Sequence, residues 1–171
     1  MGYHDHKVRS GEERSGAIPC GIITVSDTRT FETDASGAAI RMALLQDGHD
    51  VVRYEIVQDD PGSITALVQA FAAEGCQVII TNGGTGIARR DSTFEAVDSL
   101  LHKRLPGFGE LFRMLSYADI GPGAMLSRAT AGTYGRALIF CLPGSTGAVR
   151  LALERLIVPE LAHLVWETVR Q

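Results

Sequence analysis

The sequence predicts a single α/β domain with a three-layer α/β/α fold, in which helices cover both faces of a mostly parallel central sheet. Two observations lead to this prediction. Short apolar runs rich in β-branched residues alternate with longer segments of helical periodicity, and such runs are typical of strands buried on both faces. The chain has 171 residues, which suits one domain with a sizeable core. Successive strand–helix–strand units imply right-handed crossovers and hence parallel strands.

In the first half of the chain, three predicted strands alternate with two predicted helices. Two of the strands correspond to apolar runs, GIITVS at 21–26 and CQVIITN at 76–82, and the third to the strand-like segment DVVRYEIVQ at 50–58. The segments between them, ASGAAIRMALLQDG and GSITALVQAFAAEG, have the apolar spacing of helices. We expect Ser63 to cap the start of the second helix, and Gly48 and Gly75 to end the two helices.

The second half of the chain is expected to complete the sheet and its helical layers. Two helices are predicted, near residues 93–101 and 107–117. The segment SRATAGTYGRALIFCLP then predicts one or two strands with a turn at Tyr134–Gly135. The final segment, STGAVRLALERLIVPELAHLVWETV, predicts one long helix that bends near Pro159.

Two stretches of sequence bear on domain limits and location. Residues 1–17 are polar and contain glycine, so we expect a flexible N-terminal tail and a single domain over residues 18–171. The tail lacks the apolar region of a secretory signal. No apolar run approaches the roughly 20 residues that span a bilayer. The expected location is therefore cytoplasmic, with no membrane partner.

The charge balance and the cysteines exclude several classes of protein. The chain has 16 Lys and Arg against 20 Asp and Glu, a net charge of -4 at pH 7. This argues against a nucleic-acid partner but is compatible with a local anion pocket. Cys20, Cys76 and Cys141 have no CxxC spacing, and each adjoins an apolar run. We expect all three to be reduced and buried.

Ligands of open parallel sheets bind at the carboxyl ends of the strands, so the loops that follow the strands are the candidate sites. Four loops stand out: SDTRT at 26–30, QDD at 58–60, NGGTGIARRDST at 82–93 and LPGSTG at 142–147. The third has neither the Gly-Lys-Ser/Thr of a phosphate-binding P-loop nor the third glycine of a dinucleotide fingerprint. Its glycines still allow backbone N–H groups to approach an anion closely. Ser92 and Glu95 fit a capping box, which places Asp91 just before a helix.

Each loop alone is also compatible with a plain turn or helix cap: Ser26, Asp27 and Thr28 in the first, and Ser145 or Thr146 in the last. Together the loops offer an anion cradle and two separated carboxylates, Asp59 and Asp91. Mg²⁺ binds one or two carboxylates plus substrate phosphates. The combination therefore predicts phosphate chemistry carried out by positioning and charge neutralisation.

Several motifs carry a family resemblance when they are taken in order. The motifs TVSDTRT, GGTGIARRDSTFEAV, LPGFGELFRMLSY, MLSRATAG and LPGSTGAVR resemble those of the molybdopterin-binding family of molybdenum cofactor biosynthesis, the MoaB/MogA type, and more closely its MoaB branch. The resemblance covers about residues 18–171. One departure is Phe94, where the family usually has proline at the start of the helix.

The resemblance implies a MogA-like three-layer fold assembled as a homo-oligomer, either a trimer or a hexamer. It implies binding of molybdopterin, a pterin with a dithiolene and a terminal phosphate monoester. In active members, ATP adenylylates that phosphate with Mg²⁺, so that ATP and molybdopterin are the substrates. A non-catalytic pterin-binding or scaffold protein of the same pathway stays open as an alternative, as does an unrelated phosphate-ligand protein. Other proteins of the pathway are possible partners.

The resemblance also implies roles for particular residues. Asp59 and Asp91 match the two acids needed for catalysis and for Mg²⁺, although the alignment leaves Asp60 open in place of Asp59. The backbone of the glycine loop is expected to bind the ligand through Gly83, Gly84, Thr85 and Gly86. The pterin and its phosphate are assigned to Ser26, Asp27, Ser127, Gly144 and Ser145. Arg90, or its neighbour Arg89, is expected to offset charge at the transferring phosphoryl group.

Overall fold

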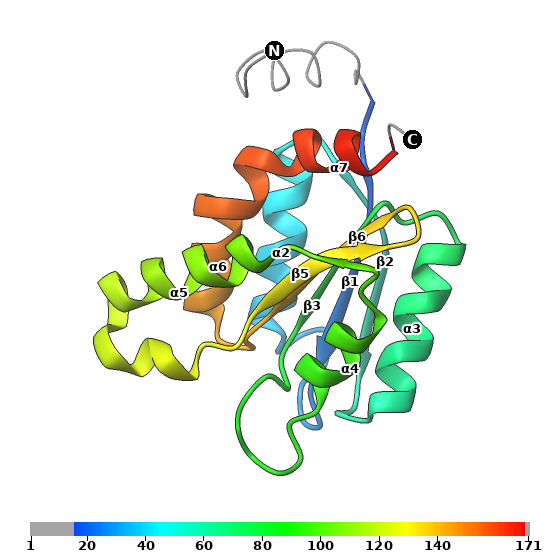
Figure 1. Ribbon diagram of the computed structural model, residues 1–171. Coiled ribbons are helices and arrows are strands. Elements are labelled where there is room, and N and C mark those ends of the chain that lie inside the picture. The colour runs from blue at the N-terminus through cyan, green and yellow to red at the C-terminus, as the bar shows by residue number, and fades with distance from the viewer. Residues whose placement is uncertain (1–15, 170–171) are drawn as a thin grey trace.

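The computed structural model describes residues 16–169, and within that part the central sheet has six strands (Figure 1). Their bounds are β1 Pro19–Val25, β2 Asp50–Val57, β3 Val78–Asn82, β4 Lys103–Arg104, β5 Thr130–Tyr134 and β6 Ala137–Leu142. The strand order is β2-β1-β3-β6-β5-β4. The pairs β1–β2, β1–β3 and β3–β6 are parallel, whereas β5 is antiparallel to both β6 and β4. The predicted, mostly parallel sheet is confirmed.

Helices cover both faces of this sheet, which confirms the three layers (Figure 1). One layer contains α2 Ala35–Gln46, α5 Pro106–Ile120, α6 Thr146–Ala152 and α7 Leu161–Val169, and the other contains α3 Pro61–Ala73 and α4 Thr93–Leu100. A 3₁₀ helix, η1 Gly121–Leu126, follows α5. Successive strand residues point to opposite layers. Ile22 and Ile80 pack with the first layer, and Ile23 and Ile79 pack with the second.

The ends of the first two helices agree with the sequence analysis except at one cap. Gly48 and Gly75 follow α2 and α3 with φ angles of 81° and 97°, a conformation that favours glycine. The expected cap at Ser63 is wrong. Asp60 caps α3, because its carboxylate accepts hydrogen bonds of 2.7 Å from both the N–H and the hydroxyl of Ser63. These bonds hold the pKa of Asp60 below its ordinary value.

The C-terminal segment is not one continuous α-helix. Between α6 and α7 the chain forms a π-helical turn over Leu153–Ile157 and a 3₁₀ turn over Val158–Glu160. Pro159 lies in the second turn, and it has no N–H with which to continue the regular hydrogen-bond ladder. The irregularity predicted near Pro159 is therefore present, as a widened turn followed by a tightened one.

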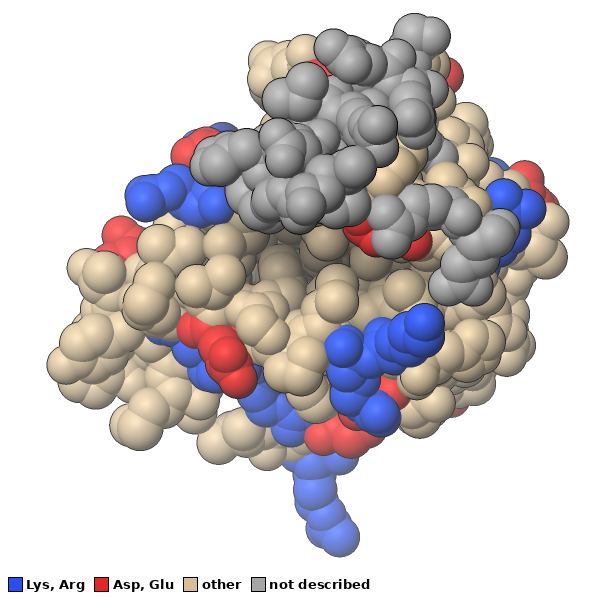
Figure 2. Space-filling model, turned by 45° about the horizontal axis from the view of Figure 1, so that its top comes forward, with Lys and Arg blue, Asp and Glu red and all other residues tan. Residues whose placement is uncertain are grey.

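The ends of the chain and its surface were also subjects of prediction. Most of the predicted tail, residues 1–15, lies outside the described residues. Within residues 16–169 no helix has the length and apolar character needed to cross a membrane. On the face that Figure 2 shows, basic and acidic side chains are interspersed, and they do not form one broad basic patch there.

The three cysteine thiols are free and buried, as expected. Burial raises the pKa of the Cys20 and Cys141 thiols to about 12 and also raises that of Cys76. Because the thiolate is the reactive form, we expect 5,5′-dithiobis(2-nitrobenzoate) at pH 8 to label the native protein only slowly. All three thiols should react at once in denaturant. Rapid labelling of one thiol in the native protein would contradict this assignment.

Candidate functional site

A cavity of about 560 Å³ opens where strands β1, β3 and β6 end, and we call it the strand-end pocket. Three chain segments that are distant in sequence supply most of its wall. Its lining consists of Val25, Ser26, Thr28, Arg29, Gly83, Gly84, Thr85, Gly86, Leu126, Pro143, Gly144 and Ser145. Seven of these are among the residues singled out from the sequence, namely Ser26, Gly83, Gly84, Thr85, Gly86, Gly144 and Ser145. Strand order explains the convergence, because β3 lies between β1 and β6.

Two glycines shape the centre of the pocket. Gly83 and Gly84 have φ angles of 100° and 62°, which residues with a side chain rarely adopt. A Cβ atom on Gly83 would overlap the backbone carbonyl of Val25, and one on Gly84 would overlap the carboxylate of Asp59. The N–H of Gly83 also donates to the carbonyl of Leu142 at 3.1 Å. At Gly83 the backbone of the glycine loop therefore contacts the ends of both neighbouring strands, β1 at Val25 and β6 at Leu142.

Asp59 borders the glycine loop from the end of β2. Its Oδ1 accepts hydrogen bonds from the N–H of Ser92 at 3.2 Å, the hydroxyl of Ser92 at 2.7 Å and the hydroxyl of Thr93 at 3.4 Å. Its Oδ2 faces the α-carbon of Gly84. Asp60 turns away and caps α3. Of the two adjacent acids, Asp59 is thus the one that lies beside the glycine loop.

The predicted capping box at the start of α4 does not form. Ser92 occupies the N-cap position, but its side chain makes no capping hydrogen bond to the helix, and its hydroxyl is oriented toward Asp59, to which it donates. Glu95, the other half of the predicted box, pairs with Arg128 at 2.6 Å. The start of α4 is therefore fixed by a carboxylate that comes 33 residues earlier in the chain.

Asp91 borders the same loop from its other end. Its Oδ2 accepts a hydrogen bond from the N–H of Ala88 at 3.0 Å and lies where a Cβ on Gly86 would be. Asp59 and Asp91 therefore flank one glycine loop, although neither is in the lining of the pocket. Within residues 16–169 no group of three or more His, Cys, Asp or Glu side chains could hold a metal ion.

The other residues singled out from the sequence lie outside the lining of the pocket. Asp27 accepts a 3.4 Å hydrogen bond from the N–H of Asp59 and pairs with Arg90 at 3.4 Å, but neither Asp27 nor Arg90 is in the lining. The Arg90 side chain is 79% exposed. Ser127 ends η1 and is also outside the lining, whereas its neighbour Leu126 is part of it.

Two lining hydroxyls also organise the local backbone. The hydroxyl of Ser26 accepts from the N–H groups of Thr28 and Arg29, at 3.3 and 3.1 Å. Ser145 caps α6 by accepting from the N–H of Ala148 at 3.2 Å. Ser26 therefore stabilises a turn and Ser145 caps a helix, and both residues also line the cavity.

Phe94, the departure from the family pattern, has a local partner. The guanidinium of Arg128 lies over its ring, 4.6 Å from the centroid. The same Arg128 pairs with Glu95 in the next position of α4. The phenylalanine thus joins α4 to the segment before β5, a contact that proline would make less well.

Thr28 and Arg29 lie in a loop that the sequence indicated, but neither was assigned to the ligand, and Leu126 was not singled out as part of the pocket. Of the residues that line it, all within the described part of the chain, Arg29 alone carries a charge. The available signal was an arginine inside a loop that follows a buried strand. That signal is weak, since most arginines in loops face solvent.

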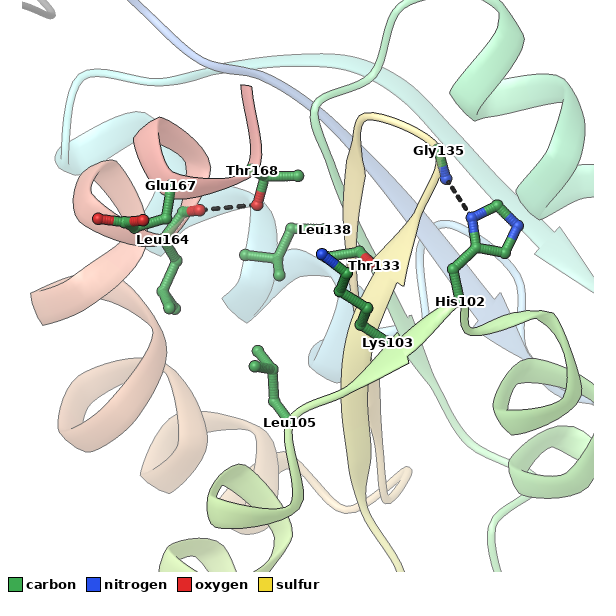
Figure 3. A pocket seen from close by; sticks show the side chains of 9 residues that line it. All are labelled: His102, Lys103, Leu105, Thr133, Gly135, Leu138, Leu164, Glu167 and Thr168. Carbon is green, nitrogen blue, oxygen red and sulfur yellow. Dashed lines mark hydrogen bonds between the residues drawn. The ribbon is translucent and has the colours of Figure 1, made fainter. Parts of the chain in front are cut away.

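A second cavity of about 280 Å³ lies between β4, β5 and α7 (Figure 3). Two of its polar groups are bonded within the protein. Nδ1 of His102 accepts from the N–H of Gly135 at 3.2 Å, and the hydroxyl of Thr168 donates to the carbonyl of Leu164 at 2.7 Å. None of the residues singled out from the sequence lines this cavity.

Comparisons with known proteins agree with the fold and the motifs. Residues 21–163 match the family model described as a probable molybdopterin binding domain. Molybdenum cofactor biosynthesis protein B of Bacillus anthracis is 53% identical over 173 residues, which cover 100% of both chains. A crystal structure of a molybdenum cofactor biosynthesis protein B has a TM-score of 0.89 at 54% identity, covering 92% of this chain and 99% of that one.

A second solved structure is the molybdopterin biosynthesis enzyme MoaB of Thermus thermophilus. It has a TM-score of 0.80 at 39% identity and covers 90% of this chain and 98% of that one. Family model, sequence relatives and solved structures thus agree with the resemblance seen in the motifs. The chain belongs to the molybdopterin-binding family of molybdenum cofactor biosynthesis proteins, the MoaB/MogA type.

Proposed function

We propose that this protein acts in molybdenum cofactor biosynthesis, binds molybdopterin in the strand-end pocket and adenylylates its terminal phosphate with Mg-ATP. The observation that carries the proposal is the glycine loop, which forms part of the wall of the pocket and is flanked by Asp59 and Asp91. The names of the relatives support the pathway and the ligand. Phosphoryl transfer depends mainly on positioning and charge stabilisation, which such a loop can supply.

The chemistry of the two carboxylates fits Mg²⁺. Among residues 16–169, Oδ2 of Asp59 and Oδ1 of Asp91 accept no hydrogen bond, while the second oxygen of each is held by N–H or hydroxyl donors. Hard oxygen ligands of this kind, completed by water and substrate phosphates, are what Mg²⁺ prefers. When bound, the ion would neutralise charge on the triphosphate.

The reaction needs little from the protein beyond orientation. An oxygen of the terminal phosphate monoester attacks the α-phosphorus of ATP and forms a phosphoanhydride bond. The bond between the α-phosphorus and the bridging oxygen breaks, and pyrophosphate leaves. Because the attacking phosphate is already anionic near neutral pH, no general base is required. The N–H groups of Gly84 and Gly86 would orient the phosphates, and the exposed Arg90, which pairs with Asp27, would offset their charge.

Incubation with molybdopterin, Mg²⁺ and ATP labelled at the α-phosphate tests this proposal. We expect pyrophosphate release together with a labelled pterin, and background levels of both for Asp91→Asn. Asp50→Asn is the matched control, because Asp50 is exposed at the opposite end of the sheet, where β2 begins. Equal release from the wild-type protein and Asp91→Asn would overturn the catalytic role.

One observation favours a second candidate function, pterin binding without turnover. Oδ1 of Asp59 already accepts from both donors of Ser92 and from Thr93, so this carboxylate has a structural task at the start of α4. Retention of molybdopterin without any pyrophosphate release would favour the non-catalytic function over the transferase.

We also propose that the protein is a homo-oligomer, a trimer or a hexamer, that associates through α5 and η1. These two elements expose a row of large apolar side chains: Leu111, Met114, Tyr117, Ile120, Met125 and Leu126. Apolar patches of this extent are rare on monomers. The row ends at Leu126, which lines the strand-end pocket, so association would occur beside the site.

Light scattering tests this proposal through the mass in solution. We expect a multiple of the 18.4 kDa chain mass for the wild-type protein and a smaller species for Met114→Glu, because a buried charge disrupts an apolar interface. Met42→Glu on α2 is the matched control, since Met42 is 58% exposed and Met114 is 60% exposed. A monomeric wild-type protein at working concentration would contradict the proposal.

A further inference from the structure

Arg29 is held in a fixed position at the wall of the strand-end pocket. Its Nη2 donates to the carbonyl of Gly144 at 3.0 Å, and its Nη1 pairs with Oδ1 of Asp34 at 3.3 Å. The side chain is 31% exposed, and the residue is part of the lining. A guanidinium has five N–H donors in a planar fork, so these two contacts leave further donors for a ligand.

The anchor of Arg29 is a buried carboxylate. The Asp34 side chain has no exposed surface. Besides Arg29, it accepts from the N–H of Gly37 at 2.9 Å and from the hydroxyl of Tyr54 at 2.5 Å. Burial acts to raise the pKa of Asp34, but these hydrogen bonds and the charge of Arg29 outweigh it, so that the pKa lies below its ordinary value. Asp34 is therefore ionised at neutral pH.

Tyr54 is the second anchor, and it reaches Asp34 from β2. Burial and the neighbouring Asp34 charge raise the pKa of the Tyr54 hydroxyl above its ordinary value. The hydroxyl therefore remains a donor at neutral pH and continues to orient the carboxylate. The ion pair between buried Asp34 and partly exposed Arg29, together with these hydrogen bonds to Asp34, orients the guanidinium.

The same cluster sets the position of the loop opposite the glycines. The carbonyl of Gly144 accepts from Arg29 and also from the hydroxyl of Ser36 at 2.9 Å. Gly144 in turn lies against Gly83, because a Cβ on Gly144 would be 3.0 Å from the α-carbon of Gly83. Arg29 thus lies between a rigid acidic anchor and the wall of the pocket.

We propose that Arg29 is the side chain of the strand-end pocket that binds a phosphate of the ligand, and that Asp34 and Tyr54 are positioning residues for it. This inference rests on the proposed function, since it takes the ligand of the pocket to be a phosphorylated one. The planar guanidinium matches the geometry of a phosphate. Because Arg29 is already held in place before the ligand binds, little side-chain conformational entropy is lost on binding. The ligand phosphate belongs either to the pterin or to the nucleotide.

The test compares ligands with and without the phosphate in wild-type protein and Arg29→Gln. If Arg29 binds the phosphate of the pterin, anaerobic titration with molybdopterin should show about 30-fold weaker binding to Arg29→Gln, the size of a lost charge-assisted hydrogen bond. Dephosphorylated molybdopterin should bind the two proteins equally. Arg29→Lys should recover only part of the loss, because an ammonium cannot replace the fork. Arg41→Gln, on the exposed side of α2, is the matched control and should bind like the wild-type protein.

A parallel titration with Mg-ATP identifies which phosphate Arg29 contacts. A loss confined to Mg-ATP assigns Arg29 to the nucleotide, and a loss confined to molybdopterin assigns it to the pterin phosphate; either result supports the proposal. Unchanged binding of both ligands to Arg29→Gln overturns it, as does an equal loss for the dephosphorylated pterin. Failure of the wild-type protein to bind molybdopterin at all would instead refute the proposed function.

The positioning role is tested by a double-mutant cycle. If Asp34 acts through Arg29, the Gln substitution should weaken binding much less in an Asp34→Asn background than in the wild-type protein. Tyr54→Phe keeps the ion pair and should weaken binding by only about 3-fold, because the lost hydrogen bond acts on the ligand only through Asp34 and Arg29. Thermal melting of each variant verifies that it is folded. Full additivity of the Asp34 and Arg29 effects would refute the positioning role.

Discussion

Alanine at position 83 is expected to destabilise the protein by about 3 kcal/mol or more, since a strained backbone and a steric overlap act together. Gly83 has a φ of 100°, and its added Cβ would overlap the carbonyl of Val25. Relief requires β1 and β3 to separate at their carboxyl ends, where the strand-end pocket opens. Ligand binding should therefore be lost with the stability. Urea unfolding and molybdopterin titration measure the two effects.

Gly48→Ala is the matched control for this substitution. Gly48 has a φ of 81°, yet nothing lies within 4 Å of an added Cβ. Only the conformational cost should remain, about 1 kcal/mol. A similar cost for both variants would mean that the close approach between Gly83 and the carbonyl of Val25 adds no strain to the Gly83→Ala variant.

Asp59→Asn is expected to lower pyrophosphate release at least about 100-fold, because a charge that counts mainly in the transition state is removed. The Asn side chain can still accept hydrogen bonds from Ser92 and Thr93 through its carbonyl oxygen. The start of α4 should therefore persist, and the melting temperature should change little. Pyrophosphate release and thermal melting, measured on the same samples, separate loss of chemistry from loss of fold.

Asp60→Asn is the comparison that distinguishes the two neighbouring acids. Asp60 caps α3 through Ser63 and does not contact the glycine loop. Its replacement should leave turnover unchanged, since asparagine is also a good N-cap. Loss of turnover in Asp60→Asn, with normal turnover in Asp59→Asn, would reverse the assignment of the acid beside the loop.

The fold was predictable because its signals are local. Apolar runs such as GIITVS and CQVIITN have the length and β-branching of buried strands, and the glycines after α2 and α3 end those helices. The strand β4 escaped prediction. It consists of only two exposed residues, Lys103–Arg104, and it pairs with β5 at the edge of the sheet. Nothing in two charged residues indicates a strand.

The errors within the site arise from contacts between residues distant in the chain. Ser92 has the spacing of a capping box, but its side chain is oriented toward Asp59, and no local pattern reveals that orientation. Arg29 and Asp34 look like ordinary turn residues until the fold places Tyr54 and the carbonyl of Gly144 beside them. Local sequence indicated which loops meet, whereas their hydrogen-bond partners depended on tertiary packing.

The strand order determines how local unfolding of the sheet affects the strand-end pocket. The strands whose ends form it, β1, β3 and β6, are all interior members of the sheet, while β2 and β4 form its two edges. Fraying begins at edges, where fewer neighbours hold the backbone. Amide protons of Ile80 and Ile139 should accordingly rank among the slowest to exchange with deuterated solvent. The strand-end pocket should therefore keep its shape during local unfolding that already detaches the edge strands.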